Sequence, residues 1–432
     1  MAGLVPRPCE YGRTPAPDWR KTDLPSRDLP SRDRKGAVLA VRGLVGAVGG
    51  TGGGEGAGGA DTPSALGGSA SSAGGARWRM PAEWEPHEGT WLGWPHEKSD
   101  WPGKFAPIPF VYAKIIARLS RVERVHILVQ SEAEIKLASR LARREGAAAD
   151  NIDFHICPTD RSWVRDTAPV FTVDGDGGLC ATDWHFNGWA KYPNWKQDDK
   201  VPAFIARRLK CKRVAPAAEG KRFVLEGGSI DVNGTGALLT TEECLLSPIQ
   251  ARNPHLDRGQ IEAVLMEYLG LDRVIWLLNG IEGDDTHGHV DDLARFVSAD
   301  TVVIATGNAR KDPNVKVLER TEGLRIVPLP MPDPVYYDGQ LLPASYANFY
   351  IANQLVLVPT FNDRHDRAAL STLAKLFPDR EVAGIDCTDL VLGLGTLHCM
   401  TQQQPLAQAG GVTASGSAPD KPSSASGAKS PR

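Results

Sequence analysis

The chain has 432 residues, of which 41% are hydrophobic and 23% are charged, and its net charge is −3. This composition is ordinary for a protein that buries a core, and the charge excludes the strongly basic surface that nucleic acids or anionic membranes attract. No apolar run approaches the roughly 20 residues needed to span a bilayer. We therefore expect a soluble, cytoplasmic protein that binds neither nucleic acid nor membrane.

The two ends of the chain differ from its middle. Residues 1–79 contain the tandem repeat LPSRDLPSRD and a glycine-rich tract, and residues 409–432 are equally low in complexity. Such segments bury too little apolar surface to offset the entropy of ordering. We predict disordered ends at 1–79 and 409–432 around one catalytic domain at 80–408. An organelle transit peptide within 1–79 is an alternative, although acidic residues such as Glu10 and Asp18 argue against it.

Within 80–408, single helices alternate with strands. One of the helices shows a capping box of Ser131 and Glu134, and a hairpin is indicated by Asn233-Gly234. The alternation predicts an α/β protein built from similar units. Within 80–408 no GxGxxG or GxxxxGK[ST] motif is present, so no nucleotide cofactor is expected. The predicted helices are 131–146, 257–270 and 365–377, and the predicted strands include 122–129, 152–157, 274–278, 354–361 and 381–387.

The seven cysteines are odd in number and lack CxxC spacing. This pattern argues against a disulfide scaffold or a zinc ribbon, and we expect most of these thiols to be small buried hydrophobic residues.

Four clusters of polar residues follow predicted strands, where loops commonly carry function. Each also has a structural reading, because an Arg-Asp pair can simply hold a loop and a Glu-Gly-Gly can simply be a turn. The clusters are TDRSWVRDTAP (159–169), LEGGSID (225–231), GDDTHGHVDDLARF (283–296) and GLGTLHCMTQQQP (393–405).

The third cluster places His287 and His289 among four aspartates. Imidazoles and carboxylates at this spacing resemble a zinc, manganese or iron site, which the cluster taken alone favours. Alternatively, His289 is a general acid and base, and Asp291, two residues along an extended strand, faces the same side of the backbone.

Cys399 in the fourth cluster changes that balance. A thiol nucleophile, a histidine and several carboxylates fit together when the substrate is a cation. A guanidinium is planar, and its paired N–H groups match carboxylates side-on. The glycines beside Cys399 are expected to let the backbone approach such a planar group.

These residues and their surroundings resemble the bacterial-type peptidylarginine deiminase family, and within it the agmatine deiminases. The resemblance runs from Met80 to about Gln404. It is carried by MPAEWEPHEGTWLGWP, SWVRDTAP, DWHFNGWAKYPNW, LEGGSIDVNGTGALLTTEECLL, GDDTHGHVDDLARF, LPASYANFYIANQLVLVPTF and GLGTLHCMTQQQP. It implies the pentein fold of guanidine-modifying enzymes, a five-bladed α/β propeller of ββαβ units.

The resemblance also implies a reaction. Agmatine would be hydrolysed to N-carbamoylputrescine and ammonia, a step of putrescine and polyamine biosynthesis, without metal or organic cofactor. Cys399 would be the nucleophile that forms an amidino-cysteine intermediate. His289 would act first as acid and then as base, with Glu226 supporting it. The family's tendency toward homodimers makes a homodimer the expected assembly.

The same resemblance implies the substrate contacts. Asp166 and Asp291 would bind the guanidinium, Trp163 would lie near the alkyl chain or the cation, and Asp285 would hold the far amine of agmatine. His287 and His398 are expected in supporting or structural positions. One departure is Ala168 in RDTAP, where the family pattern has a glycine that can adopt positive φ.

Three alternatives remain open at this point. The same chemistry could act on free or peptidyl arginine, in which case Arg165 or Arg252 could meet the carboxylate of free arginine. A metallohydrolase could use the HGHVDD residues. The chain could also be an inactive binding protein.

Overall fold

The computed structural model describes residues 78–407. The predictions for the N-terminal extension and for the C-terminal tail lie outside the described residues.

The described chain forms five separate sheets of three or four strands, together with two small hairpins. In four of these sheets an antiparallel pair is extended by a parallel strand, and the connection to that strand contains a helix. The fifth unites the two ends of the described chain, because β20 pairs antiparallel with β1, and β2 and β3 follow in parallel. The mixed α/β class is confirmed.

Each of the five sheets is accompanied by at least one helix. The first sheet and its helices comprise β1 (His87–Gly93), α1 (Ile108–Leu119), β2 (Arg124–Val129), α2 (Glu132–Arg144), β3 (Ile152–Ile156) and β20 (Thr401–Pro405). The second comprises α3 (Val164–Thr167), β4 (Val170–Val173), β5 (Leu179–Thr182), α4 (Val201–Leu209) and β6 (Lys212–Val214). The third comprises β9 (Asp231–Val232), β10 (Ala237–Thr241), α5 (Glu242–Leu245), α6 (Arg258–Leu269) and β11 (Arg273–Leu277).

The remaining elements complete the described chain. The fourth sheet has β12 (Ala294–Ser298), β13 (Thr301–Ala305), α7 (Pro313–Glu319) and β14 (Arg325–Leu329), and the fifth has β17 (Tyr350–Ala352), β18 (Leu355–Thr360), α8 (Asp366–Leu376) and β19 (Glu381–Asp386). The hairpins are β7 (Ala217–Ala218) with β8 (Lys221–Arg222), and β15 (Tyr336–Tyr337) with β16 (Gln340–Leu341). The 3-10 helices are η2 (Lys98–Asp100), η3 (Ala149–Asn151), η4 (Asp198–Lys200), η5 (Gly227–Ser229), η6 (Val290–Asp292) and η7 (Leu390–Gly393).

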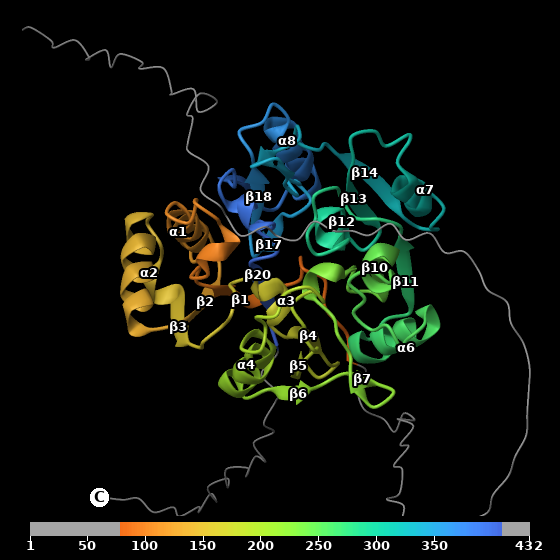
Figure 1. Cartoon of the computed structure of the whole chain (residues 1–432), viewed down its shortest axis with the longest axis horizontal. Helices are drawn as coiled ribbons and strands as arrows, with labels where there is room; N and C mark the ends of the chain where they lie inside the picture. Colours follow the sequence, from red (N-terminus) through yellow and green to blue (C-terminus); the bar gives the residue numbers. More distant parts are fainter. Residues whose placement is uncertain (1–77, 408–432) are drawn as a thin grey trace, which may run out of the picture. The chain divides into compact units, whose positions relative to one another are not determined.

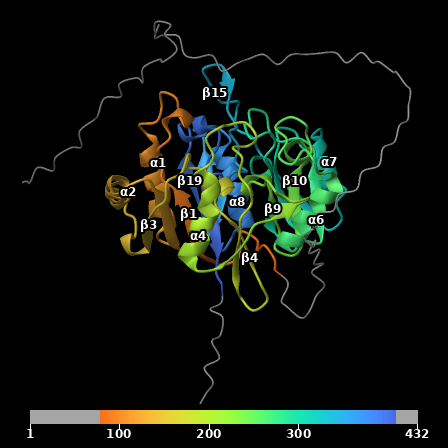
Figure 2. The same cartoon turned by 60° about the horizontal axis from the view of Figure 1, so that its bottom comes forward.

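The five sheets follow one another in chain order around the centre of the view in Figure 1, close to the short helix α3. In Figure 2, β15 lies at the edge of the view, away from the main sheets. Within residues 78–407 no sheet closes on itself by hydrogen bonding. The helices α3, η5 and η6 come directly before β4, β9 and β12, the first strands of their sheets.

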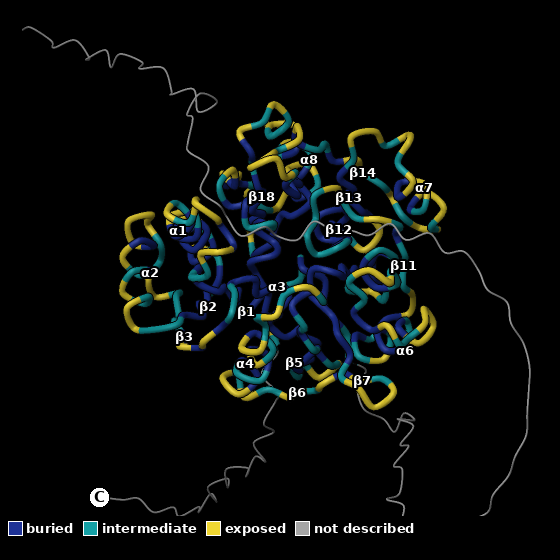
Figure 3. The backbone as a smooth tube through the Cα atoms, viewed as in Figure 1, coloured by how far each residue is buried: buried dark blue, intermediate teal, exposed yellow. Residues whose placement is uncertain are grey.

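Burial follows the same arrangement. Figure 3 shows the central segments as buried, whereas the outer helices carry the exposed residues. The central strand β18, LVLVPT, is buried at all but its last position, because it has a neighbour on each side. The edge strand β19, EVAGID, alternates between exposed and buried positions in its second half. Within 78–407, no helix combines the length and the apolar character needed to cross a bilayer.

The predicted helices and strands are found within one or two residues of their expected ends, but two local details differ. Ser131 precedes α2 without donating or accepting a side-chain cap bond, and Glu134 instead accepts a hydrogen bond from Gln130 N (2.8 Å). The predicted capping box is therefore wrong. The hairpin between β9 and β10 exists, but its turn takes four residues, because Asn233 Oδ1 accepts bonds from Thr235 N and Ala237 N.

Candidate active site

Cys399 lies in the loop between η7 and β20, near the centre of the five sheets. Its side chain is 7% exposed. Asn348 donates a hydrogen bond from Nδ2 to Cys399 Sγ (3.1 Å), and Oδ1 of the same residue accepts from His398 N (3.0 Å). Sγ also lies 3.6 Å from Asp291 Oδ2. The loop that presents the thiol is thus held by one amide side chain from the segment before β17.

The glycines beside Cys399 lie against aromatic rings, and their predicted role in the approach of a planar substrate stays a prediction. A Cβ at Gly395 would lie 3.1 Å from the Trp163 ring and 3.2 Å from Cys399 Sγ, and one at Gly393 would lie 2.7 Å from Trp101 and Trp163. They make room for tryptophan rings. Trp163 is buried at the N-terminal end of α3, and its Nε1 donates to Asp100 Oδ2 (3.0 Å). It therefore forms a fixed apolar wall next to the thiol.

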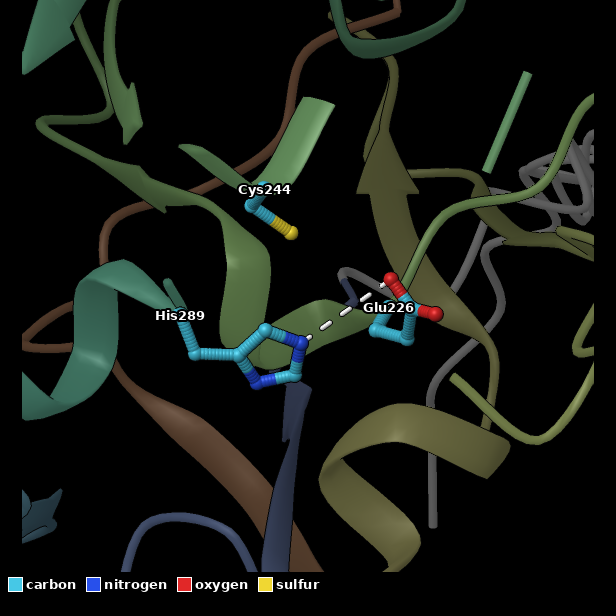
Figure 4. A group of neighbouring side chains, drawn as sticks. All are labelled: Glu226, Cys244 and His289. Atoms are coloured by element: carbon cyan, nitrogen blue, oxygen red, sulfur yellow. Dashed lines mark ion pairs between the residues drawn. The ribbon is translucent and has the colours of Figure 1, made fainter. Parts of the chain in front are cut away.

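His289 is the residue immediately before η6 and is 1% exposed. Its Nδ1 lies 3.9 Å from Asp166 Oδ2, and its Nε2 lies 3.9 Å from Glu226 Oε2 (Figure 4). Neither ring nitrogen has a hydrogen-bond partner among residues 78–407. Asp284, which the sequence did not single out, accepts bonds from Gly288 N and His289 N (2.8 Å each) and so fixes this backbone. The imidazole is therefore held in place but free to exchange protons.

Asp166 and Asp291 converge on the same point as His289. A Cβ at Gly228 would lie 2.6 Å from His289 Nδ1, 2.9 Å from Asp166 Oδ1 and 3.1 Å from Asp291 Oδ2. Asp166, in α3, accepts bonds from Gly228 N and from Trp189 Nε1 (2.9 Å each). The Glu-Gly-Gly sequence is thus more than a turn, because the second glycine allows three side chains to meet.

The backbone conformation around Asp291 differs from the predicted extended strand. Residues 290–292 form the 3-10 helix η6 and not an extended strand, so period-two alternation does not explain why Asp291 faces the same region as His289. Asp291 Oδ2 instead accepts from His398 Nδ1 (2.8 Å), while Asp291 Oδ1 has no partner in the described chain. The other ring nitrogen of His398 lies 2.8 Å from Glu83 Oε2.

Glu226 and the two arginines named in the sequence form buried ion pairs. Arg252 Nε donates to Glu226 Oε1 (3.1 Å), and both side chains are fully buried. Arg165 donates to Gln403 Oε1 (2.7 Å) and pairs with Glu83 (3.3 Å). Both guanidinium groups are therefore engaged by protein groups, which disfavours their use for the carboxylate of free arginine.

Asp285 is held apart from this convergence. Its carboxylate accepts from Lys191 Nζ and Tyr192 OH (2.5 Å each). The Tyr192 ring meets the Trp189 ring edge-on (5.8 Å between centroids), and Trp189 in turn contacts Asp166. Asp285 is thus connected to Asp166 through the rings of Tyr192 and Trp189.

The two histidines of the third cluster face different partners. His287 adopts a positive φ of 66°, and its ring contacts Ser247 Oγ (3.1 Å) and Glu243 (3.7 Å). Across 78–407, no group of three His, Cys, Asp or Glu ligand atoms contains both His287 and His289. The metal site predicted from their spacing is therefore not assembled from this pair.

The titration behaviour of the site follows from burial and charge. Burial by itself would lower the pKa of His289, but the carboxylates of Asp166, Glu226 and Asp291 outweigh it and raise that pKa to about 9. Burial raises the pKa of Asp166 to about 6, although His289 acts in the opposite direction. Burial also opposes ionisation of Glu226, but Arg252 and His289 lower its pKa to about 2. At neutral pH His289 is a cation surrounded by carboxylates.

Burial and nearby carboxylates also affect the Cys399 thiol, where both disfavour the ionised form. Burial, followed by the nearby carboxylates Asp291, Asp292 and Asp166, raises the pKa of Cys399 well above its usual value. Asp292 is itself buried with Oδ1 unpartnered among the described residues, and burial together with Asp291 raises its pKa strongly. The site thus has an excess of hydrogen-bond acceptors, and the Cys399 thiol is un-ionised. Both features are expected of a site that binds a cation.

Ala168 causes no strain. Its φ is −80° and its ψ is 163°, so the position does not require the positive φ that a glycine could supply. The departure from the family pattern leaves the α3 backbone in an ordinary conformation.

Glu83 and Asn348 were not predicted from the sequence, and Asp292 was named only as one of the four aspartates of the third cluster. All three are buried; Glu83 and Asn348 contact the loop of Cys399, and Asp292 follows Asp291. They lie in or beside quoted motifs, but nothing in their spacing pairs residues so distant in the chain. The only signal in the sequence was that buried polar residues need partners.

Comparison with known proteins agrees with this geometry. Residues 79–405 match the model of the Porphyromonas-type peptidyl-arginine deiminases. The chain is 38% identical over 363 residues to the agmatine deiminase of Stutzerimonas stutzeri strain A1501, covering 76% of this chain and 95% of the relative. It is 36% identical over 362 residues to that of Pseudomonas aeruginosa strain LESB58, with the same coverage of both chains.

Solved structures show the same similarity. Agmatine deiminase of Enterococcus faecalis superposes with a TM-score of 0.67 at 31% identity, covering 76% of this chain and 96% of its own. A cysteine-to-serine variant of Campylobacter jejuni agmatine deiminase with substrate bound gives 0.69 at 31% identity, covering 78% and 98%. With more than half of its length matched, this chain belongs to the Porphyromonas-type peptidyl-arginine deiminase family.

Proposed function

We propose that this enzyme hydrolyses agmatine to N-carbamoylputrescine and ammonia through a covalent intermediate on Cys399. The relatives named agmatine deiminase support the substrate, and the family supports a reaction at a guanidine C–N bond. The observation that carries the mechanism is the meeting of an unpartnered His289 with the carboxylates of Asp166 and Asp291 at Gly228, with the Cys399 thiol 3.6 Å from Asp291 Oδ2, all within the described residues.

Binding uses the excess of acceptors. The guanidinium of agmatine presents N–H groups in one plane, and carboxylates satisfy such groups in pairs. Asp166 and Asp291 are the two acceptors, and the Asp291 Oδ1 that lacks a partner within 78–407 is one place for a substrate N–H. Trp163 borders the alkyl chain, and Asp285 exchanges Lys191 for the far amine of agmatine.

The first chemical step forms a C–S bond. A bound guanidinium places a positive charge next to Sγ, which lowers the cost of ionising the thiol among carboxylates. The thiol releases its proton to solvent, and the thiolate attacks the guanidinium carbon and gives a tetrahedral adduct. His289, protonated at neutral pH, donates its proton to one –NH₂ group of the adduct. That C–N bond then breaks, ammonia leaves, and an amidino-thioether remains on Cys399.

The second step reverses these roles. His289, now neutral, takes a proton from a water molecule that attacks the same carbon. The new tetrahedral adduct collapses with cleavage of the C–S bond, and the proton on His289 accompanies the departing sulfur or returns to solvent. The product is the carbamoyl group of N-carbamoylputrescine. Glu226 keeps the imidazole oriented and its cationic form stable.

Other predictions remain part of this proposal. We propose that the five sheets are the five blades of a pentein propeller, which their ββαβ connectivity supports. The domain limits of 80–408, the homodimer, the cytoplasmic location and catalysis without a metal stay predictions from the sequence and its resemblance.

The test is intact-protein mass spectrometry after acid quench during turnover of agmatine. Wild type should gain the mass of one amidino adduct that maps to Cys399, whereas Cys399→Ala should gain none and release no ammonia. Arginine in place of agmatine should give little adduct. Ammonia release that persists in Cys399→Ala and stops with a chelator would overturn the cysteine mechanism in favour of a metallohydrolase.

A further inference from the structure

A second thiol lies beside the acid–base histidine and has no part in the proposed reaction. Cys244 is fully buried in α5. Thr241 Oγ1 accepts from Cys244 N (3.0 Å) and donates to Gly288 O, the residue before His289. The hydroxyl thus ties α5 to the His289 loop and keeps the two side chains adjacent.

Cys244, His289 and Glu226 come from three separate segments and face a common space (Figure 4). One atom of each, the sulfur, a ring nitrogen and a carboxylate oxygen, lies within 4.8 Å of the other two. His289 Nε2 and Glu226 Oε2 are 3.9 Å apart. Tetrahedral zinc with its usual bond lengths separates such a nitrogen and oxygen by about 3.4 Å. This nitrogen and oxygen would therefore have to approach each other by about half an ångström, within the reach of side-chain rotation.

The state of these atoms favours a metal over an internal hydrogen bond. His289 is 1% exposed, yet its Nε2 has no hydrogen-bond partner in the described chain. A buried ring nitrogen without a partner is costly, so a ligand on Nε2 is favoured, and Zn²⁺ would displace the proton that this nitrogen carries in the cation. Sulfur, imidazole and carboxylate together form a donor set for zinc or cobalt, whereas magnesium and calcium prefer oxygen alone.

The surrounding charged groups suit a metal at this position. Asp166 Oδ2 faces His289 Nδ1 at 3.9 Å, the arrangement in which a carboxylate orients a metal-bound histidine. Arg252 binds Glu226 from the other side and balances one negative charge of the set.

We propose that Cys244, His289 and Glu226 form a binding site for Zn²⁺, and that its occupation inhibits the enzyme. Zinc on Nε2 would prevent His289 from carrying a proton, so it would stop both ammonia release and water activation. Metal binding rests on the geometry alone, while inhibition rests also on the proposed function.

Binding is measured first, without reference to turnover. Titration of the metal-free full-length protein with Zn²⁺ in a calorimeter should give one site, and Mg²⁺ should give none. Co²⁺ at this site should show a thiolate-to-cobalt charge-transfer band. Cys399→Ala should retain the band, which separates this site from the neighbouring group of Asp291, Asp292 and Cys399.

The variants locate the sulfur ligand. Cys244→Ala should lose the cobalt band. The zinc concentration that halves the agmatine turnover of this variant should be at least about tenfold higher than for wild type. Cys180→Ala is the matched control, because Cys180 is another buried free thiol and belongs to none of the ligand groups in the described chain. It should behave as wild type. If Cys244→Ala is unstable by thermal melting, Glu226→Gln serves in its place for the binding assay and should weaken zinc binding.

The opposite results would overturn the proposal. These are the absence of zinc binding to wild type, or a cobalt band that survives in Cys244→Ala but disappears in Cys399→Ala. If zinc binds as predicted but agmatine is not a substrate, the metal site stands and the proposed function fails.

Discussion

In the proposed reaction Cys399 is the nucleophile, and the carboxylates around it oppose formation of its thiolate. The same carboxylates attract a guanidinium, so the site becomes reactive when its substrate supplies the missing positive charge. This coupling makes the ionisation of individual residues decisive for activity.

The acid limb of the pH profile belongs to Asp166. Its pKa is raised to about 6, so the carboxyl gains a proton and loses its charge below that pH. His289 has a pKa raised to about 9 and loses the proton needed for ammonia release above it. We expect kcat/KM for agmatine, measured in buffer with chelator, to form a bell between about pH 6 and 9 and to fall about tenfold per unit on the acid side. A rate that stays flat from pH 8 to pH 4 would contradict this assignment.

His398 has an unexpectedly central position for a residue predicted to be supporting. Its two ring nitrogens each lie 2.8 Å from a carboxylate oxygen, of Asp291 and of Glu83. The ring thus bridges Glu83 and Asp291, and His398 positions Asp291.

Replacing His398 should affect both stability and the pH profile. We expect His398→Gln to lower the free energy of unfolding by about 3 kcal/mol, because it leaves buried carboxylates short of a partner, and to lower kcat/KM about 100-fold. Without His398 the pKa of Asp291 rises, so the acid limb should move to higher pH. His287→Gln, at a half-buried position in the neighbouring loop, should change neither property much. An unshifted acid limb in His398→Gln would argue for a purely structural role.

At the scale of elements, the short helix η5 determines whether the site can form. Gly228 in this helix lies where a methyl group would contact His289, Asp166 and Asp291. We expect Gly228→Ala to reduce kcat/KM at least about 100-fold with little change in the unfolding transition, because the obstruction falls on catalytic side chains. Gly307→Ala is the control, since a Cβ there meets nothing within 4 Å. Wild-type activity in Gly228→Ala would show that the three side chains do not need this approach.

The same scale shows where sequence patterns succeed and fail. Periodicity located α2, α6 and α8, because each buries one face along its length. The capping pattern at Ser131 failed because Glu134 found a nearer donor, whereas Asp257 and Gln260 form a capping box at α6. Several neighbouring polar groups can form the hydrogen bonds at a helix N-terminus, and sequence spacing alone does not determine which of them does.

For the whole molecule, the family match and every proposed site residue fall within 79–405. We expect a chain trimmed to residues 78–407 to keep kcat/KM for agmatine within about twofold of the full-length enzyme, as befits a domain with its own core. Steady-state kinetics of the two proteins, with thermal melting as a control for folding, provides the measurement. A large loss of activity in a trimmed protein that melts normally would assign a catalytic role to the ends.

The sequence by itself determined the α/β class and the order of the strands and helices, because periodicity is local. It also singled out Cys399, His289, Glu226 and the aspartates as candidate site residues through their motifs and the family resemblance, and their catalytic roles stay predictions. Only the tertiary structure decided which groups meet. His398 binds Glu83, 315 residues away, and Cys244 lies beside His289, although no spacing in the chain relates either pair. The reason is physical: a buried polar atom pairs with whatever donor or acceptor the packed sheets bring within about 3 Å, and that distance is set by the fold.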